Sequence, residues 1–164
     1  MSPISIEPPV MVLFQKLAQE GDLTPDDGIW KRVLSVHDHW LSEAEAATES
    51  ISFSAFGSLQ EYRFYLREED KFVALLAALF RIGSAFYLEP SSSTVLPLES
   101  WQQLISLTTT GLREKGHFLF YFRRFQLLLA SAFDLNVSAY FLDPQQQDAL
   151  AELAHGYQLH LLEP

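Results

Sequence analysis

The sequence predicts an all-α fold, in which residues 1–164 form a single domain of roughly six or seven helices around a central apolar helix. Most of the chain repeats its apolar residues at helical spacing. Residues 118–133 are apolar nearly all round, which is typical of a helix enclosed by other helices. An α+β fold is the alternative, with a small sheet formed by residues 51–56, 85–88 and 137–142.

The N-terminal third predicts two helices. Two prolines precede the apolar periodicity of residues 10–20, and Gly21 ends it. Thr24 then offers an N-cap, with a proline in the first turn and two acids facing the helix N-terminus. This second helix continues into the acidic, alanine-rich residues 43–49. Its expected inner stripe is Ile29, Val33, Val36, His37 and Trp40.

The middle of the chain predicts one strand and one long helical stretch. Residues 51–56 alternate apolar and serine positions, the pattern of a half-buried strand. Ser58 and Glu61 have the spacing of a capping box. Helical periodicity then runs over residues 59–86, either as one helix or as two helices with a break near residues 67–70.

The C-terminal half predicts three further helices. Residues 89–94 form a clear loop, and Pro97 marks the start of the next helix. Aromatic residues in 118–122 also favour a strand, but the length of the apolar stretch 118–133 favours a helix. Asp143, followed by a proline, predicts the start of the C-terminal helix.

Acidic residues are concentrated at both ends of the chain. Residues 125–164 contain five acids and no lysine or arginine, and residues 1–60 contain nine acids and three basic residues, within a net charge of −10. This surplus disfavours sequence-independent nucleic-acid binding, because phosphates would be repelled. Many proteins, however, carry a surplus of acidic residues merely to stay soluble. No signal peptide or membrane-spanning stretch is visible, so we expect a soluble, cytoplasmic protein that does not contact a membrane.

Motifs that carry chemistry are scarce. The chain has no cysteine, nucleophile elbow, phosphate-binding loop or calcium-binding loop, so an enzyme is the less expected reading and no cofactor is predicted. Glu-x-x-His occurs at Glu114–His117 and Glu152–His155, a spacing used in di-iron bundles. Gly116 interrupts the first copy, and no further acids accompany the pair on apolar stripes. We therefore predict no metal site.

Four residues suggest an anion-binding pocket. Arg113, His117, Arg123 and Arg124 border the most apolar segment, and guanidinium groups bind phosphate or carboxylate in bidentate fashion. A helical ligand-binding or enzymatic domain with this pocket is the alternative function. The favoured interpretation is internal pairing, because buried arginines are almost always paired and the chain has a surplus of acids.

Two groups of residues predict a protein-binding surface. Tyr62, Arg63 and Tyr65 cannot all face inward on one helix, and exposed tyrosine and arginine are enriched in binding hot spots. Asp148 and Glu152 share an exposed face of the C-terminal helix. The sequence therefore predicts a small acidic protein that neutralises or escorts a protein with a basic face, such as a toxin or secreted effector. Immunity proteins, inhibitors, chaperones and adaptors act in this way.

Overall fold

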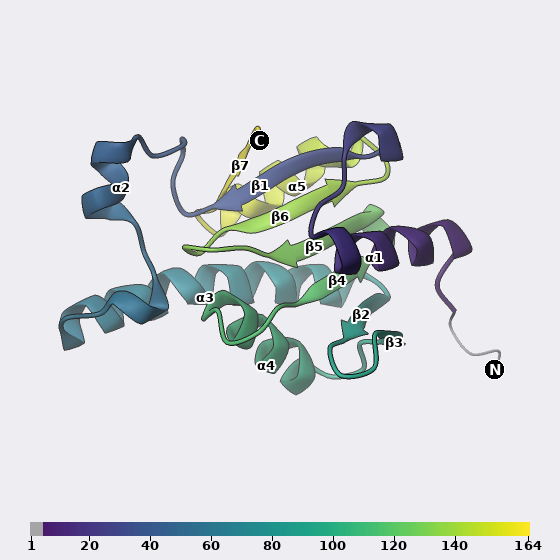
Figure 1. The fold of residues 1–164 in the computed structure, drawn as a ribbon, viewed down its shortest axis with the longest axis horizontal. Helices are drawn as coiled ribbons and strands as arrows, with labels where there is room; N and C mark the ends of the chain where they lie inside the picture. Colours follow the sequence, from purple (N-terminus) through teal and green to yellow (C-terminus); the bar gives the residue numbers. More distant parts are fainter. Residues whose placement is uncertain (1–4) are drawn as a thin grey trace.

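The computed structural model describes residues 5–164 and shows an α+β fold, so the all-α prediction is wrong (Figure 1). Within these residues five α-helices accompany one seven-stranded antiparallel sheet. The helices are α1 (Pro8–Glu20), α2 (Glu43–Glu49), α3 (Leu59–Ile82), α4 (Trp101–Leu112) and α5 (Gln146–Gly156). The strands are β1 (Trp30–Ser35), β2 (Ala85–Glu89), β3 (Thr94–Pro97), β4 (Leu119–Phe122), β5 (Leu127–Ser131), β6 (Val137–Phe141) and β7 (His160–Leu162).

The strands lie in the order β3-β2-β4-β5-β6-β1-β7. β4, β5 and β6 form a meander at the centre, and the N-terminal β1 is inserted between β6 and the C-terminal β7. Val33 of β1 is opposite Ser138 of β6 on one side and Leu162 of β7 on the other. The first and last strands of the chain therefore complete the same end of the sheet.

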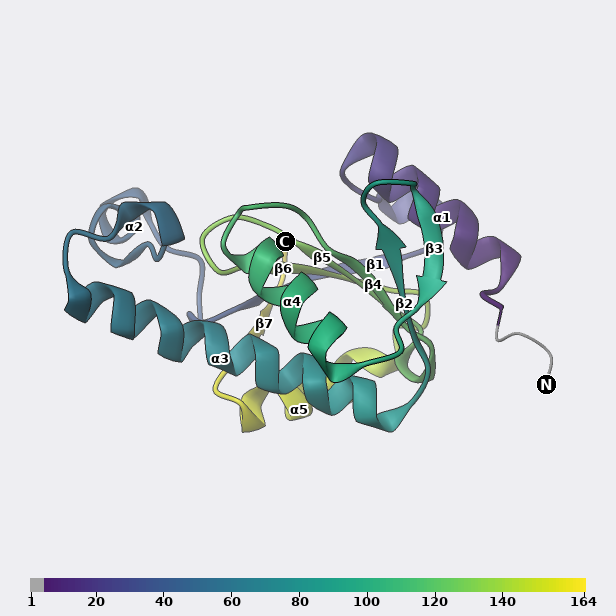
Figure 2. The ribbon, with the colours of Figure 1, turned by 90° about the horizontal axis from the view of Figure 1, so that it is seen from below.

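Helices cover the two faces of the sheet unequally. Figure 2 shows α3, α4 and α5 on one face and α1 on the other. The larger apolar core lies between the three helices and the sheet, where Phe72 and Leu76 of α3 pack with Phe120 of β4 and Leu150 of α5. On the opposite face, Phe14 of α1 belongs to a smaller cluster that draws its strand residues from β2–β6. Neither β1 nor β7 contributes to that smaller cluster, so part of this face has no helix over it.

The predicted central helix, 118–133, is instead the antiparallel pair β4 and β5, joined by a short turn at Arg123–Phe125. Both strands are covered on both faces: Phe120 contributes to the larger core, and its neighbour Tyr121 to the smaller one. A strand buried on both faces has apolar residues at every position, so its sequence lacks the alternation that identifies a strand. Two such strands with a short turn reach the length expected of a helix.

Other sequence predictions divide between confirmed and wrong. The helix expected over 10–20 is confirmed as α1. The helix expected over 59–86 is confirmed over 59–82 as one unbroken helix, but residues 85–86 belong to β2. Strands expected near 85–88 and 137–142 in the alternative fold are confirmed as β2 and β6. The strand expected at 51–56 is wrong, because this segment forms a 3-10 turn. The second helix is also wrong over most of its length, since residues 30–35 form β1 and only α2 is helical.

Serine caps account for the start of three helices. Ser42, Ser58 and Ser100 each accept a hydrogen bond from the backbone amide three residues later. The capping box expected at Ser58 is half present. Its hydroxyl accepts from the amide of Glu61 at 3.1 Å, but the Glu61 carboxylate accepts from the amide of Gly57 instead. The start of α3 is therefore fixed by two separate contacts.

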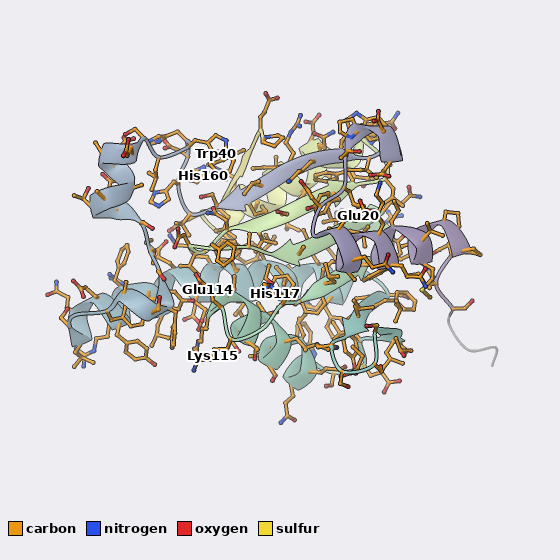
Figure 3. All side chains as sticks on the ribbon, in the orientation of Figure 1. Glu20, Trp40, Glu114, Lys115, His117 and His160 are labelled. Atoms are coloured by element: carbon orange, nitrogen blue, oxygen red, sulfur yellow. The ribbon has the colours of Figure 1, made fainter. Side chains whose placement is uncertain are left out.

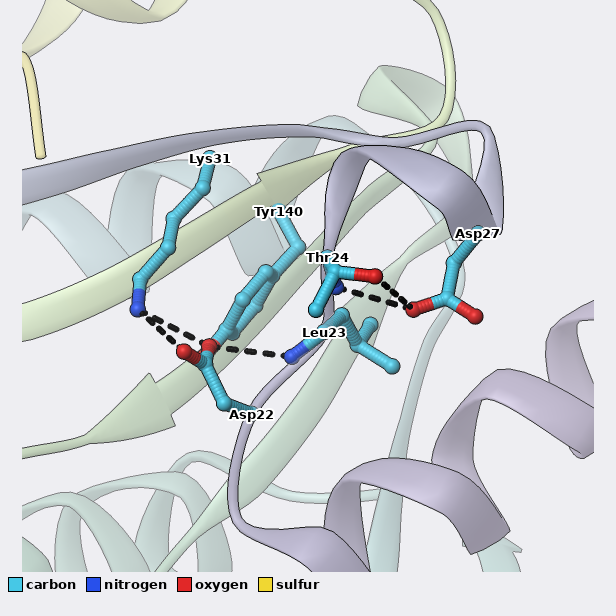
Figure 4. Close-up of polar contacts among 6 residues, drawn as sticks. All are labelled: Asp22, Leu23, Thr24, Asp27, Lys31 and Tyr140. Atoms are coloured by element: carbon cyan, nitrogen blue, oxygen red, sulfur yellow. Dashed lines mark hydrogen bonds and ion pairs between the residues drawn. The ribbon is translucent and has the colours of Figure 1, made fainter.

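A polar network attaches the segment after α1 to the sheet (Figure 4). The Asp22 carboxylate accepts hydrogen bonds from Lys31 Nζ at 2.8 Å and from the Tyr140 hydroxyl at 2.7 Å. Asp27 accepts from the Thr24 amide at 2.8 Å, which closes the following turn. These contacts connect the end of α1 to β1 and β6.

Candidate functional site

The chain leaves the sheet after β1 and forms a projecting arm, residues 36–58, before it enters α3. The arm contains α2 and lies at the opposite end of the sheet from α1 (Figures 1 and 2). Its base is held by His39, whose ring nitrogens lie 2.6 Å from a carboxylate oxygen of Asp38 and 3.2 Å from one of Glu45. Glu45 also closes a capping box with Ser42 at the start of α2.

A cleft of about 560 Å³ lies between the arm and the first turns of α3. Aromatic and aliphatic side chains on its wall come from both sides: Ile51 and Phe56 from the arm, and Phe64 from α3. Two carboxylates, Glu49 and Glu61, line it as well. The complete lining is His37, Ala47, Thr48, Glu49, Ser50, Ile51, Ser52, Ala55, Phe56, Glu61 and Phe64.

Two further hollows continue this cleft around the base of the arm. The smaller, of about 140 Å³, shares His37, Ser50 and Ile51 with the cleft. The larger, of about 420 Å³, lies over the part of the sheet that α1 leaves open, and its wall includes Val33 and Ser138. These two hollows share Trp40, Asp134 and Asn136. The three hollows thus adjoin one another through shared wall residues, and together we call them the arm tract.

Two aromatic side chains project from the rim of the arm tract. Trp40 is 52% exposed, and its indole N–H donates a 2.5 Å hydrogen bond to the carbonyl of Glu163, next to β7. Phe133 is 67% exposed in the turn between β5 and β6. Figure 3 shows Trp40 where β1 leads into the arm. Tryptophan and other large aromatics that remain exposed are typical of protein-binding hot spots.

The turn that carries Phe133 has an uncommon backbone. Asp134 and Leu135 both have positive φ, at 55° and 53°. Two-residue hairpin turns favour this conformation, which Asp tolerates but a branched side chain rarely adopts. Leu135 is nevertheless buried in the larger core. Its burial holds the turn in place and leaves the preceding Phe133 side chain facing outward.

The arm carries a strong negative charge. Residues 33–62 contain no lysine or arginine, and their acids are Asp38, Glu43, Glu45, Glu49 and Glu61. Hydrogen bonds from Ser42 and His39 lower the pKa of Glu45 to about 2, so this carboxylate stays ionised. A ligand that enters the cleft between the arm and α3 therefore meets aromatic side chains and carboxylates, without a lysine or arginine.

The aromatic group predicted to bind a partner divides between core and surface. Tyr65 is fully buried, and its hydroxyl donates a 2.9 Å hydrogen bond to the carbonyl of Leu112. Burial raises its pKa above the ordinary value. Tyr62 is half-buried against Phe56, while Arg63 is exposed. None of these three residues lines the cleft, to which α3 contributes Glu61 and the exposed Phe64.

Asp148 and Glu152 are exposed on α5, as the helix pattern predicted. Neither residue lines the arm tract, whose walls come from the arm, α3, β1, β6, the β5–β6 turn and the C-terminus. The structure therefore does not bring these two acids together with the aromatic group of α3 in one hollow.

The four residues of the predicted anion-binding pocket do not converge. Arg113 makes two hydrogen bonds of 2.6 and 2.7 Å to the buried Glu69, and Nε of Arg123 lies 2.8 Å from Glu7. His117 and Arg124 are exposed beyond opposite ends of β4. Two of the arginines are thus internally paired, which is the favoured interpretation of the sequence. None of the four lines a hollow described above.

The Glu-x-x-His spacings also remain apart. Glu114 and His117 lie in the connection between α4 and β4, together with Lys115 (Figure 3). Over residues 5–164 no three His, Asp or Glu side chains are arranged to hold a metal ion.

The arm itself is what the sequence analysis missed, since residues 36–49 were expected to continue a packed helix. One sequence feature indicated it. Residues 33–62 contain no lysine or arginine, so the acids of this segment cannot form ion pairs with lysine or arginine of the same segment. No sequence feature identified Phe133 as part of the site. Phe133 lines the same hollow as Trp40 because β6 pairs with β1.

No helix within residues 5–164 combines the length and apolar character that a membrane crossing requires. Comparison of the chain with protein-family models, with curated proteins and with solved structures gives no match.

Proposed function

We propose that this protein binds another protein that presents a basic face, and that the arm tract is its docking surface. The observation that carries the proposal is the presence of three adjoining hollows around an acidic arm, with Trp40 and Phe133 exposed beside them. Aromatic anchors bury large areas at little entropic cost, and they set the lifetime of a complex.

Charge supports the choice of a basic partner. The arm contributes acids without lysine or arginine, within a chain of net charge −10. Opposite potentials on two proteins speed their encounter and disfavour partners of like charge. A small acidic cytoplasmic protein of this kind would neutralise a toxin or escort a secreted effector by covering its basic surface.

Capture of partners from the source cells tests the proposal. The wild-type chain and a Trp40→Ser/Phe133→Ser variant serve as baits at 50 mM and 500 mM salt. Both substitutions are at exposed positions, so the fold should be retained, and circular dichroism checks this. We expect the wild type to retain a basic protein at low salt, and expect both the variant and high salt to release it.

A matched bait with Ile105→Ser controls for the loss of any exposed apolar residue, since Ile105 on α4 is 44% exposed. Retention of the partner by this control but not by the double variant supports the proposal. The proposal fails if the double variant keeps the partner, or if the wild type retains only proteins without a basic surface.

A further inference from the structure

The cleft between the arm and α3 combines aromatic rings with carboxylates, the two kinds of group that bind arginine side chains elsewhere in this fold. Two internal arginines show how this fold binds a guanidinium group. Arg113 lies 5.2 Å from the ring centre of Phe53 while it pairs with Glu69. Arg123 lies 4.9 Å from the ring centre of Phe86 while it pairs with Glu7. Each guanidinium combines one aromatic ring with one carboxylate, which suits its flat shape and its fork of N–H donors.

The cleft offers the same combination with no lysine or arginine among the residues that line it. Phe56 and Phe64 supply rings, and Glu49 and Glu61 supply carboxylates. One Glu61 oxygen accepts from the Gly57 amide, whereas Glu49 forms no hydrogen bond or ion pair among the described residues. Arg67 lies 5.5 Å from the ring centre of Phe64, but it does not line the cleft.

We infer that the cleft binds an arginine side chain of the partner. The inference rests on the proposed function, and it names the chemistry that the partner must present at this point. The guanidinium group lies against the aromatic wall and pairs with Glu49, while Glu61 adds negative charge. A volume of about 560 Å³ is within the range of roughly 300–1,000 Å³ that ligand pockets occupy, so the cleft also has room for backbone on either side of the arginine.

Titration of the ¹⁵N-labelled full chain with N-acetyl-arginine amide tests the inference directly. We expect saturating shifts of the backbone amides of residues 47–64. N-acetyl-citrulline amide has nearly the same shape but no charge, and it should bind at least about tenfold more weakly, because a charge-assisted hydrogen bond is stronger than a neutral one. N-acetyl-lysine amide should also bind more weakly than arginine, because an ammonium group lacks the planar fork.

Two variants of α2 give a matched comparison. Glu49→Gln removes a carboxylate of the cleft and should weaken arginine binding roughly threefold to fivefold, the effect of an exposed ion pair. Glu43→Gln removes the same charge from the first turn of α2, outside the cleft, and should leave arginine binding within about twofold of the wild type. Phe64→Leu should also weaken binding, since it removes an aromatic ring and keeps an apolar side chain.

Equal binding of citrulline and arginine, shifts that map outside residues 47–64, or equal losses in the two α2 variants would each overturn the inference. These failures are distinct from failure of the proposed function. If arginine amide does not bind but partner capture still depends on Trp40 and Phe133, the protein binds its partner through the rest of the arm tract. If no arm-tract variant affects capture, the proposed function itself fails.

Discussion

Single charged residues hold distant parts of this chain together, and Asp22 is the clearest example. It connects the end of α1 to Lys31 of β1 and to Tyr140 of β6. Partial burial raises its pKa, but the hydrogen bonds from Lys31, Tyr140 and the next backbone amide lower it more, so the pKa lies below 3.8. A lowered pKa means that the ionised form of the carboxylate is more stable in the folded state than in the unfolded state.

The Asp22→Asn substitution should therefore reduce the free energy of unfolding by about 1 kcal/mol at pH 7, a value that allows for the half-exposed side chain. The contribution of Asp22 is present above the pKa of the unfolded chain, near 4, and is lost as the pH falls through the lower pKa of the folded state. Urea unfolding at pH 7 and pH 3 measures this, and the difference from wild type should shrink at pH 3. Asp26→Asn is the control, and an equal effect there would contradict the assignment.

The stability contributions of a paired and an unpaired arginine can be compared at Arg113 and Arg124. Arg113→Ala leaves the carboxylate of Glu69, which is 3% exposed, without its partner, and should cost about 2–4 kcal/mol. Arg124 is exposed and forms no ion pair within residues 5–164, so Arg124→Ala should change stability by less than about 0.5 kcal/mol. Chemical denaturation of both variants measures the two changes in the free energy of unfolding. Equal losses would show that the internal pairing of Arg113 carries little stability.

At the scale of elements, the close approach of α4 to the sheet depends on one glycine. A Cβ atom at Gly111 would lie 2.5 Å from a ring carbon of Phe118 and 3.0 Å from Cβ of Ser131. Gly156 ends α5 and has nothing within 4 Å of the same position. The two glycines therefore differ in packing alone, since neither has a positive φ.

Gly111→Ala should destabilise the fold by about 1–3 kcal/mol, because the added methyl group forces α4 away from β4 and β5. Gly156→Ala should be neutral or stabilising by up to about 1 kcal/mol, since alanine restricts the unfolded chain. Thermal unfolding of the two variants separates these effects. A Gly111→Ala protein as stable as the Gly156→Ala protein would mean that α4 does not pack this closely.

The arm should respond to pH through His39. Its hydrogen bond with Asp38, followed by that with Glu45, raises its pKa above 6.5. Protonated His39 therefore stabilises the arm fully at pH values below the pKa of histidine in the unfolded chain. This stabilisation is lost as the pH rises through the raised pKa of His39 in the folded state. We expect amide hydrogen exchange in α2, corrected for intrinsic rates, to be better protected at pH 6 than at pH 8. His39→Gln should remove this difference, and unchanged protection in the wild type would contradict the role of His39.

The elements show where sequence patterns succeed and fail. The helices α1 and α3 each have one buried and one exposed face, so their periodicity was readable. β4 and β5 lack that contrast, because Phe120 and Tyr121 are buried on opposite faces of the sheet. The candidate site was partly readable from the acids of the arm and the aromatic residues near Tyr62. Its geometry was not, because the hollow between Trp40 and Phe133 exists only when β1 pairs with β6.

At the scale of the whole molecule, the main core and the proposed binding surface lie on different parts of the sheet, because helices cover its two faces unequally. α3, α4 and α5 fill one face, and α1 covers only part of the other. The uncovered end carries the arm, the exposed Trp40 and Phe133, and the three hollows of the arm tract. A partner that docks there would meet aromatic side chains within a negative field, while the main core remains undisturbed.

Site-specific photo-crosslinking in the source cells tests this docking surface most directly. A benzoylphenylalanine residue replaces Phe133 on the rim of the arm tract in one protein and Ile105 on α4 in another; both positions are exposed. We expect a crosslinked adduct with a basic protein from position 133 and none from position 105. An adduct from position 105 alone would contradict this expectation and would place the binding surface on the helical face of the molecule.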